Sequence, residues 1–151
     1  IPGWNSAEFD PLRATFYRWI TRGHLAVDTY GPALAWLTGQ PTDLVKINAH
    51  ELATIGADRG ARPPASVARW IVTDGPATVR VWDGARHTEF TPPRVKEISP
   101  TGSGDVLFAC VVEALYRRRQ SLEEAVQFAL PYASANAAHT GIAEFPEPPT
   151  A

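Results

Sequence analysis

Short apolar runs alternate with amphipathic stretches along the first half of the chain, and most of the runs end at a polar residue. Three of these runs have the length of buried strands and lie at residues 24–28, 43–47 and 69–73. Apolar residues at helical spacing predict short helices next to them, at residues 10–23, 32–37 and 49–55. Strands that alternate with helices are typical of a parallel α/β sheet.

The second half of the chain predicts a hairpin followed by two long helices. Asp83-Gly84 is a two-residue turn signal, and the strands that flank it are expected at residues 79–82 and 87–90. Residues 104–119 are apolar nearly all round, which predicts a buried helix. Ser121-Leu-Glu-Glu124 has the pattern of a capping box and opens the last helix.

The tryptophans divide into two predicted environments. Trp19 belongs to an apolar stripe on the first helix, which we expect to face the core, together with Leu12, Phe16 and Ile20. Trp4 is expected at the edge of a pocket instead.

Composition narrows the class of protein. The 151 residues are 44% hydrophobic and 20% charged, which fits a single α/β domain over residues 1–151 with a sizeable core. A net charge of −2 without a basic run argues against nucleic-acid binding, and no apolar run is long enough for a membrane span. The single cysteine predicts a cytoplasmic location. Because the chain starts at Ile1 and contains no methionine, we expect it to be a fragment.

The turn Thr101-Gly-Ser-Gly-Asp105 carries the most informative chemistry. It places two glycines and two hydroxyls at the start of the predicted helix 104–119, with one carboxylate in the first turn. A helix N-terminus offers unpaired N–H groups to an anion, but a carboxylate there would repel a bound phosphate. The same carboxylate suits a base that deprotonates a hydroxyl while the N–H groups hold the developing charge. The simpler alternative is a glycine-rich turn that only caps a core helix.

Other polar residues follow the predicted strands, at the ends where parallel α/β sheets bind ligands. Asp28, the segment 46–51 and Thr73-Asp-Gly75 occupy such positions. Asn48 and Glu51 have the spacing of an N-cap and its N3 acid, which is a structural role.

Four segments in order resemble the ribokinase-like (PfkB) carbohydrate kinase family. Thr101–Asp105 resembles that family's T/V-G-A/S-G-D signature, and Val45-Lys-Ile-Asn-Ala-His-Glu-Leu52 resembles its K-P-N-x-x-E-L segment. Thr73-Asp-Gly75 resembles its T-x-G nucleotide loop. Asp28-Thr-Tyr-Gly-Pro-Ala-Leu34 is similar to a stretch of members that act on sugar phosphates. The resemblance covers the C-terminal half of a family member.

The resemblance implies an ATP- and Mg²⁺-dependent kinase acting on a sugar or sugar-phosphate hydroxyl. Asp105 would be the base, and the N–H groups of Gly102, Ser103 and Gly104 would form the anion hole. Asn48 and Glu51 would organise Mg²⁺. The residues implied along the ATP molecule are Lys46, Thr73, Gly75, Thr101 and Asn136, with Asn136 near the adenine.

The implied fold is a ribokinase-like three-layer αβα sandwich with a mostly parallel sheet, lacking the N-terminal half and lid. A homodimer, if formed, would use that N-terminal half.

The segments depart from the family pattern at three places. Ile47 replaces the usual proline, the stretch 52–68 is short, and Asp74-Gly75-Pro76 lacks a second glycine. The short stretch and the missing N-terminal half favour a second hypothesis, in which the chain is a non-catalytic nucleotide-binding module or a degenerate kinase half. A third hypothesis is a kinase of the same fold that acts on a vitamin-like alcohol.

Overall fold

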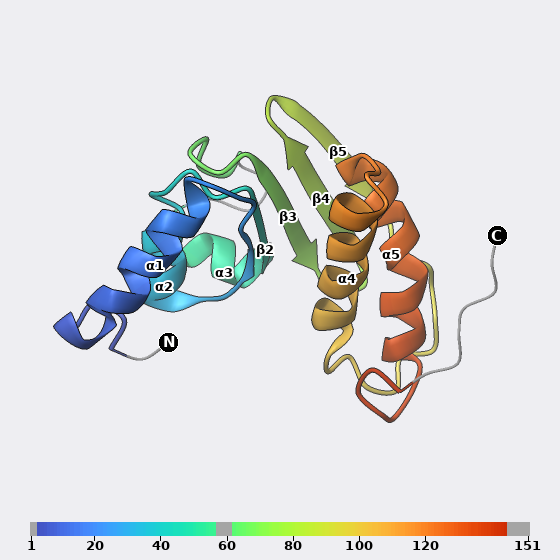
Figure 1. Cartoon of the computed structure of the whole chain (residues 1–151). Coiled ribbons are helices and arrows are strands. Elements are labelled where there is room, and N and C mark those ends of the chain that lie inside the picture. The colour runs from blue at the N-terminus through green and yellow to red at the C-terminus, as the bar shows by residue number, and fades with distance from the viewer. Residues whose placement is uncertain (1–2, 57–61, 145–151) are drawn as a thin grey trace. The chain divides into compact units, whose positions relative to one another are not determined.

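The computed structural model describes residues 3–56 and 62–144, which belong to two compact units (Figure 1). Unit 1 is built from Ile1–Thr73 and Arg80–His87, and unit 2 from Asp74–Val79 and Thr88–Ala151. The single domain over residues 1–151 stays a prediction, because this division does not tell whether the units fold independently.

Five strands form one sheet in the order β1-β2-β3-β4-β5. Their bounds are Ala26–Asp28, Leu44–Asn48, Arg69–Asp74, Thr78–Asp83 and Arg86–Phe90. The pairs β1–β2 and β2–β3 are parallel, as the alternation with helices predicted. The links from β3 to β4 and from β4 to β5 are too short for a parallel crossover, so the sheet is mixed. The predicted hairpin is confirmed, but its two-residue loop is Gly84-Ala85 rather than Asp83-Gly84, because β4 continues through Asp83. Gly84 has φ 56.

Unit 1 packs helices on one face of its strands. These helices are α1 (Asp10–Ile20), α2 (Gly31–Leu37) and α3 (Ala49–Thr54), and a 3₁₀ turn, η1 (Ala7–Phe9), precedes them. Alternate β2 residues Val45 and Ile47 share a buried cluster with Leu34 of α2 and Leu52 of α3. Because side chains alternate along a strand, Lys46 lies on the opposite face of β2.

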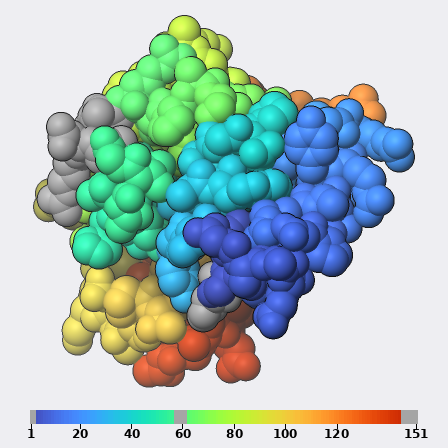
Figure 2. Space-filling view, turned by 90° about the vertical axis from the view of Figure 1, so that its left-hand side faces the viewer, coloured from blue at the N-terminus to red at the C-terminus, as the bar shows by residue number. Residues whose placement is uncertain are grey.

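The predicted core position of Trp19 is wrong, and Trp4 is more deeply buried than Trp19. Trp19 is 59% exposed on α1, whose residues lie at the surface in Figure 2 (blue). Trp19 follows Leu12 by seven residues and lies with it at one edge of the apolar stripe. Phe16 and Ile20 lie at the other edge and are more buried than Trp19. Trp4 is 1% exposed, since aromatic rings, including that of Phe16 at 6.1 Å, surround it.

Unit 2 contains two long helices that pack side by side (Figure 1). The first, α4 (Ser103–Val112), continues as a π-helical turn, η2 (Glu113–Arg117), and the second is α5 (Leu122–Ala137). The capping box at Ser121 and Glu124 is confirmed, and hydrogen bonds from Ser121 lower the pKa of Glu124. The first long helix is not buried all round, because Asp105 and Ala109 are exposed.

A helix that crosses a bilayer must be both long and apolar. Within residues 3–56 and 62–144, no helix has both the length and the apolar character for such a crossing.

Candidate active site

The glycine turn before α4 adopts a conformation that suits glycine. Gly102 is the N-cap of the helix, at φ 80 and ψ −8, a left-handed conformation that other residues rarely adopt. Its carbonyl accepts the first helical hydrogen bond, from the Val106 N–H at 2.9 Å. The Ser103 N–H donates to the Pro100 carbonyl at 3.1 Å. An anion bound by all three predicted N–H groups would therefore have to share the Ser103 group with Pro100.

Asp105 lies in the first turn of α4 and is exposed. Within the described ranges, no hydrogen bond or ion pair engages its carboxylate. A carboxylate in the first turn is favoured by the helix dipole. Asp105 therefore has a stable position and keeps its oxygens available to a substrate hydroxyl, as a general base must.

Asn136 contacts the glycine turn directly, although it is 33 residues or more away in sequence. Its Nδ2 group donates to the Thr101 carbonyl and to Ser103 Oγ, each at 2.9 Å. Asn136 is fully buried. The structure thus brings together three of the predicted site residues of unit 2.

Lys46 is the most buried charged side chain among the predicted site residues. It is 7% exposed, and its Nζ lies 2.6 Å from Asp28 Oδ2. Parallel register places Asp28 directly opposite Lys46 on the neighbouring strand, so both side chains leave the same face of the sheet. The amino-acid sequence alone does not predict this ion pair, because it does not show which residues of two neighbouring strands lie opposite each other.

Asn48 and Glu51 form a complete capping box at the start of α3. Asn48 Oδ1 accepts the Glu51 N–H at 2.9 Å, and Glu51 Oε2 accepts the Asn48 N–H at 2.8 Å. The other carboxylate oxygen, Glu51 Oε1, has no partner among the residues described. Magnesium keeps several waters and takes few protein carboxylates, so this single oxygen fits a water-mediated Mg²⁺ contact. No group of three acidic, histidine or cysteine side chains within 3–56 and 62–144 forms an all-protein metal site.

Thr73 and Gly75 flank the end of β3. Thr73 pairs in register with Asn48, so the ends of β2 and β3 coincide in unit 1. Gly75 has φ 55, and a side chain built there would meet no atom within 4 Å. Gly75 therefore leaves the backbone of this turn open on one side.

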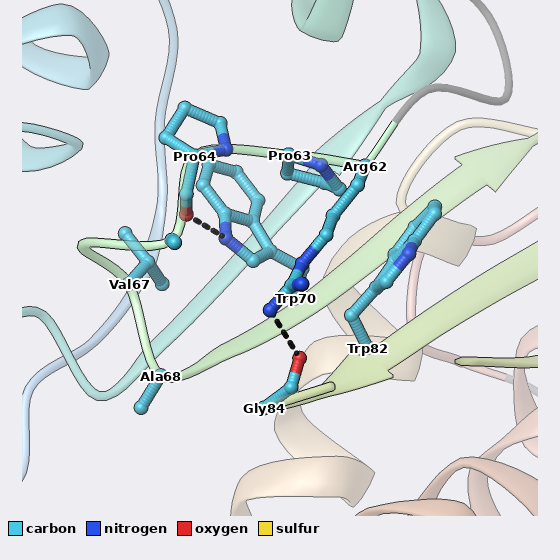
Figure 3. Close-up of a pocket in the computed structure, with 9 residues that line it drawn as sticks. Arg62, Pro63, Pro64, Val67, Ala68, Trp70, Trp82 and Gly84 are labelled. Carbon is cyan, nitrogen blue, oxygen red and sulfur yellow. Dashed lines mark hydrogen bonds between the residues drawn. The ribbon is translucent and has the colours of Figure 1, made fainter. Parts of the chain in front are cut away.

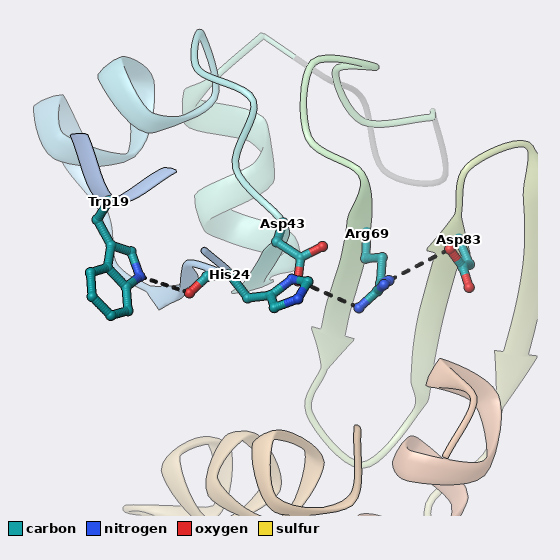
Figure 4. A network of polar contacts seen from close by, with 5 residues as sticks. All are labelled: Trp19, His24, Asp43, Arg69 and Asp83. Carbon is teal, nitrogen blue, oxygen red and sulfur yellow. Dashed lines mark hydrogen bonds and ion pairs between the residues drawn. The ribbon is translucent and has the colours of Figure 1, made fainter. Parts of the chain in front are cut away.

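A second polar cluster lies at the opposite ends of the unit 1 strands, and sequence reasoning missed it (Figure 4). Asp43 Oδ2 contacts His24 Nδ1 at 2.9 Å and an Arg69 guanidinium nitrogen at 3.5 Å. Arg69 also lies 3.7 Å from Asp83. The cluster ties the starts of β2 and β3 to the end of β4. The sequence signal that could have indicated this cluster was the presence of charged residues directly next to the predicted strands.

A small cavity of about 60 Å³ lies in unit 1 beside the indoles of Trp70 and Trp82 (Figure 3). Its polar groups are already paired, because Trp70 Nε1 donates to the Pro64 carbonyl and Arg62 donates to the Gly84 carbonyl. None of the predicted site residues lines it.

Cys110 is half-buried on α4. Burial raises the pKa of its thiol, with a smaller opposing effect from Arg118. A raised pKa keeps the thiol protonated at neutral pH, so Cys110 is a poor nucleophile.

Comparison with protein families identifies the chain. The profile described as pfkB family carbohydrate kinase matches residues 33–149. The chain belongs to the pfkB family of carbohydrate kinases. A comparison with curated proteins finds no match.

Solved structures of phosphofructokinase-2 and ribokinase share the fold. Phosphofructokinase-2 from Escherichia coli, in complex with substrates and products, superposes with a TM-score of 0.75 at 26% identity, covering 86% of this chain and 47% of that one. The same enzyme in complex with fructose-6-phosphate gives 0.74 at 26% identity, with 85% and 46% covered. Ribokinase from Thermotoga maritima gives 0.70 at 22% identity, with 85% and 48% covered. The fold is thus ribokinase-like, and the chain spans about half the length of these kinases.

Proposed function

We propose that this pfkB family chain carries the nucleotide-binding and catalytic residues of an ATP-dependent kinase that phosphorylates a sugar or sugar-phosphate hydroxyl. The observation that carries the proposal is the unengaged carboxylate of Asp105, one residue past the glycine turn at the start of α4. A cytoplasmic location belongs to the same proposal.

The proposed reaction is a phosphoryl transfer with Asp105 as general base. The carboxylate takes the proton of the acceptor hydroxyl, whose oxygen forms a bond to the γ-phosphorus while the bond from that phosphorus to the β–γ bridging oxygen breaks. ADP leaves with the electron pair of the broken bond. The N–H groups of Gly102, Ser103 and Gly104 would stabilise the charge on the transferring group.

The other predicted site residues would bind the nucleotide and its metal ion. Lys46 would contact the phosphates, Thr73, Gly75 and Thr101 would lie along the nucleotide, and Glu51 with Asn48 would hold Mg²⁺ through water. When bound, Mg²⁺ neutralises charge on the phosphate oxygens. The chain's own contribution is the oxygen of Glu51 that the capping box leaves unpaired.

A non-catalytic nucleotide-binding module is the second candidate. One observation favours it: the Ser103 N–H, which the kinase proposal assigns to the transferring phosphoryl group, is engaged by Pro100. A phosphoryl group would have to share this N–H with the Pro100 carbonyl.

Two measurements on the complete protein distinguish the candidates. Isothermal titration with ATP and Mg²⁺ measures binding, and a coupled ADP-release assay over a panel of sugars and sugar phosphates measures turnover. The kinase proposal expects binding together with sugar-dependent ADP release. Binding without turnover on any sugar would favour the module instead.

The two capping boxes of the chain provide a matched test of the magnesium role. Glu51→Gln and Glu124→Gln each remove one negative charge from the N3 position of a capped helix. We expect Glu51→Gln to weaken ATP binding at least about tenfold when Mg²⁺ is present, as is typical when a group that supports a metal is lost. Binding of ATP without Mg²⁺ should change less. Equal effects of the two variants in titration calorimetry would show that Glu51 acts only as a cap.

A further inference from the structure

Asn136 uses nearly all of its hydrogen-bonding capacity inside unit 2. Both Nδ2 donors are engaged, by the Thr101 carbonyl and Ser103 Oγ, each at 2.9 Å. Its Oδ1 accepts the Ala143 N–H at 2.7 Å. A side-chain amide has two N–H donors and one oxygen with two lone pairs, so one lone pair of Asn136 Oδ1 remains unused by these three bonds. Because the residue is also fully buried, its amide donors could contact an adenine only by leaving Thr101 and Ser103.

The segment after α5 folds back onto the glycine turn. A Cβ added to Gly102 would lie 2.5 Å from Ile142 Cγ2, so residue 142 directly covers the turn. Ala143 has φ 57, which is an unfavourable backbone conformation for alanine. Such a conformation persists where neighbouring contacts hold it, and the hydrogen bond from Ala143 to Asn136 is one of them.

The backbone that leads into the turn is fixed by a different residue. The N–H groups of Ile98 and Ser99 donate to the Ala137 carbonyl at 2.8 and 3.1 Å. The start of α4 therefore stays attached to the end of α5 when the Asn136 side chain is shortened (Figure 1). Loss of the Asn136 amide should loosen the turn locally rather than unfold the unit.

We propose that Asn136 is a positioning residue for the anion-binding turn and that it couples the turn to the segment around Ala143. It acts through Thr101 and Ser103, which it holds so that the N–H groups of the turn keep one orientation. This inference rests on the proposed function for its catalytic consequence, and it gives Asn136 another role than the expected one near the adenine. A preorganised anion site stabilises a transferring phosphoryl group only if its donors stay in place.

Amide hydrogen exchange on the ¹⁵N-labelled 151-residue chain tests the hydrogen-bond network without any substrate. In Asn136→Ala we expect the Ala143 amide to exchange about tenfold faster, as for the loss of one partly buried hydrogen bond. Ser134→Ala is the matched control, because Ser134 is also buried on α5 but makes no hydrogen bond to the turn within the described ranges. It should leave Ala143 unchanged. An unaltered Ala143 amide in Asn136→Ala overturns the proposal.

Steady-state kinetics of the complete protein tests the catalytic consequence. We expect kcat to fall about tenfold to a hundredfold with the KM for ATP within about twofold, because misplacement affects the transition state more than nucleotide binding. A raised KM for ATP with unchanged kcat would overturn the proposal in favour of an adenine contact. Absence of turnover in the wild-type protein would contradict the proposed function, while faster Ala143 exchange would still support the network.

A second variant covers the case in which Asn136→Ala fails to fold. Asn136→Ser keeps a small polar side chain at the buried position, but one hydroxyl cannot replace the two donors that serve Thr101 and Ser103. We expect faster exchange of the Ala143 amide together with a lowered kcat. A kcat equal to that of the wild-type protein would contradict the positioning role.

Discussion

Asp105→Asn should lower the rate of phosphoryl transfer by a factor of about 10² to 10⁴ and leave ATP binding nearly unchanged. The amide has almost the same shape as the carboxylate but cannot accept the proton of the acceptor hydroxyl, and a positioned general base contributes rates of this order. Asp105 is exposed and unengaged among the residues described, so its loss should not disturb packing. Coupled ADP release and titration calorimetry on the complete protein measure the two quantities.

Glu123→Gln is the matched control for this prediction. Glu123 is likewise an acidic residue in the first turn of a unit 2 helix, so both substitutions remove the same favourable charge from a helix dipole. Turnover of Glu123→Gln should stay near that of the wild-type protein. If Asp105→Asn retains activity within about tenfold, Asp105 is not the base.

Asp28→Ala should destabilise the chain by about 2 to 3 kcal/mol, since it leaves the buried Lys46 ammonium without its counter-charge. The Lys46 side chain is 9% exposed, and within the described ranges Asp28 is its ion-pair partner. The Asp28 side chain is 24% exposed, so the effect falls below that of a fully enclosed pair. Urea unfolding followed by circular dichroism measures the change.

The double variant Asp28→Ala/Lys46→Met separates loss of the pair from loss of packing. Methionine has a similar length to the aliphatic part of lysine and brings no charge into the buried site. We expect it to recover most of the stability lost in Asp28→Ala. Equal destabilisation of the single and double variants would mean that the lysine charge is not the cause. Glu113→Gln, in the exposed ion pair with Arg117, should change stability little.

Local sequence signals predicted most of the elements. The hairpin signal at Asp83-Gly84 and the two capping boxes at Asn48 and Ser121 depend on residues within a few positions of each other. The hairpin and both capping boxes are confirmed, with the hairpin loop one residue later than predicted. The prediction of one continuous α-helix over 104–119 was less accurate. An apolar run does not reveal that the helix changes from α to π geometry at Glu113.

The unpredicted features of the site depend on contacts between distant residues. Asp28 meets Lys46 only through strand register, and Asn136 meets Thr101 only because two helices pack together. The exposed position of Trp19 has a similar origin, since a helical stripe does not tell which of its edges the rest of the chain covers. The roles of the individual site residues therefore remain predictions for the variants above.

The division into two units has a spectroscopic consequence. All five tryptophans of the chain fall within unit 1, whereas Tyr116 and Tyr132 fall within unit 2. Indole emission excited at long wavelength should therefore follow the unfolding of unit 1 alone, while far-ultraviolet ellipticity follows both units. Coincident melting curves from the two signals would mean that the units unfold as one cooperative body, and separate midpoints would mean that they are distinct folding domains.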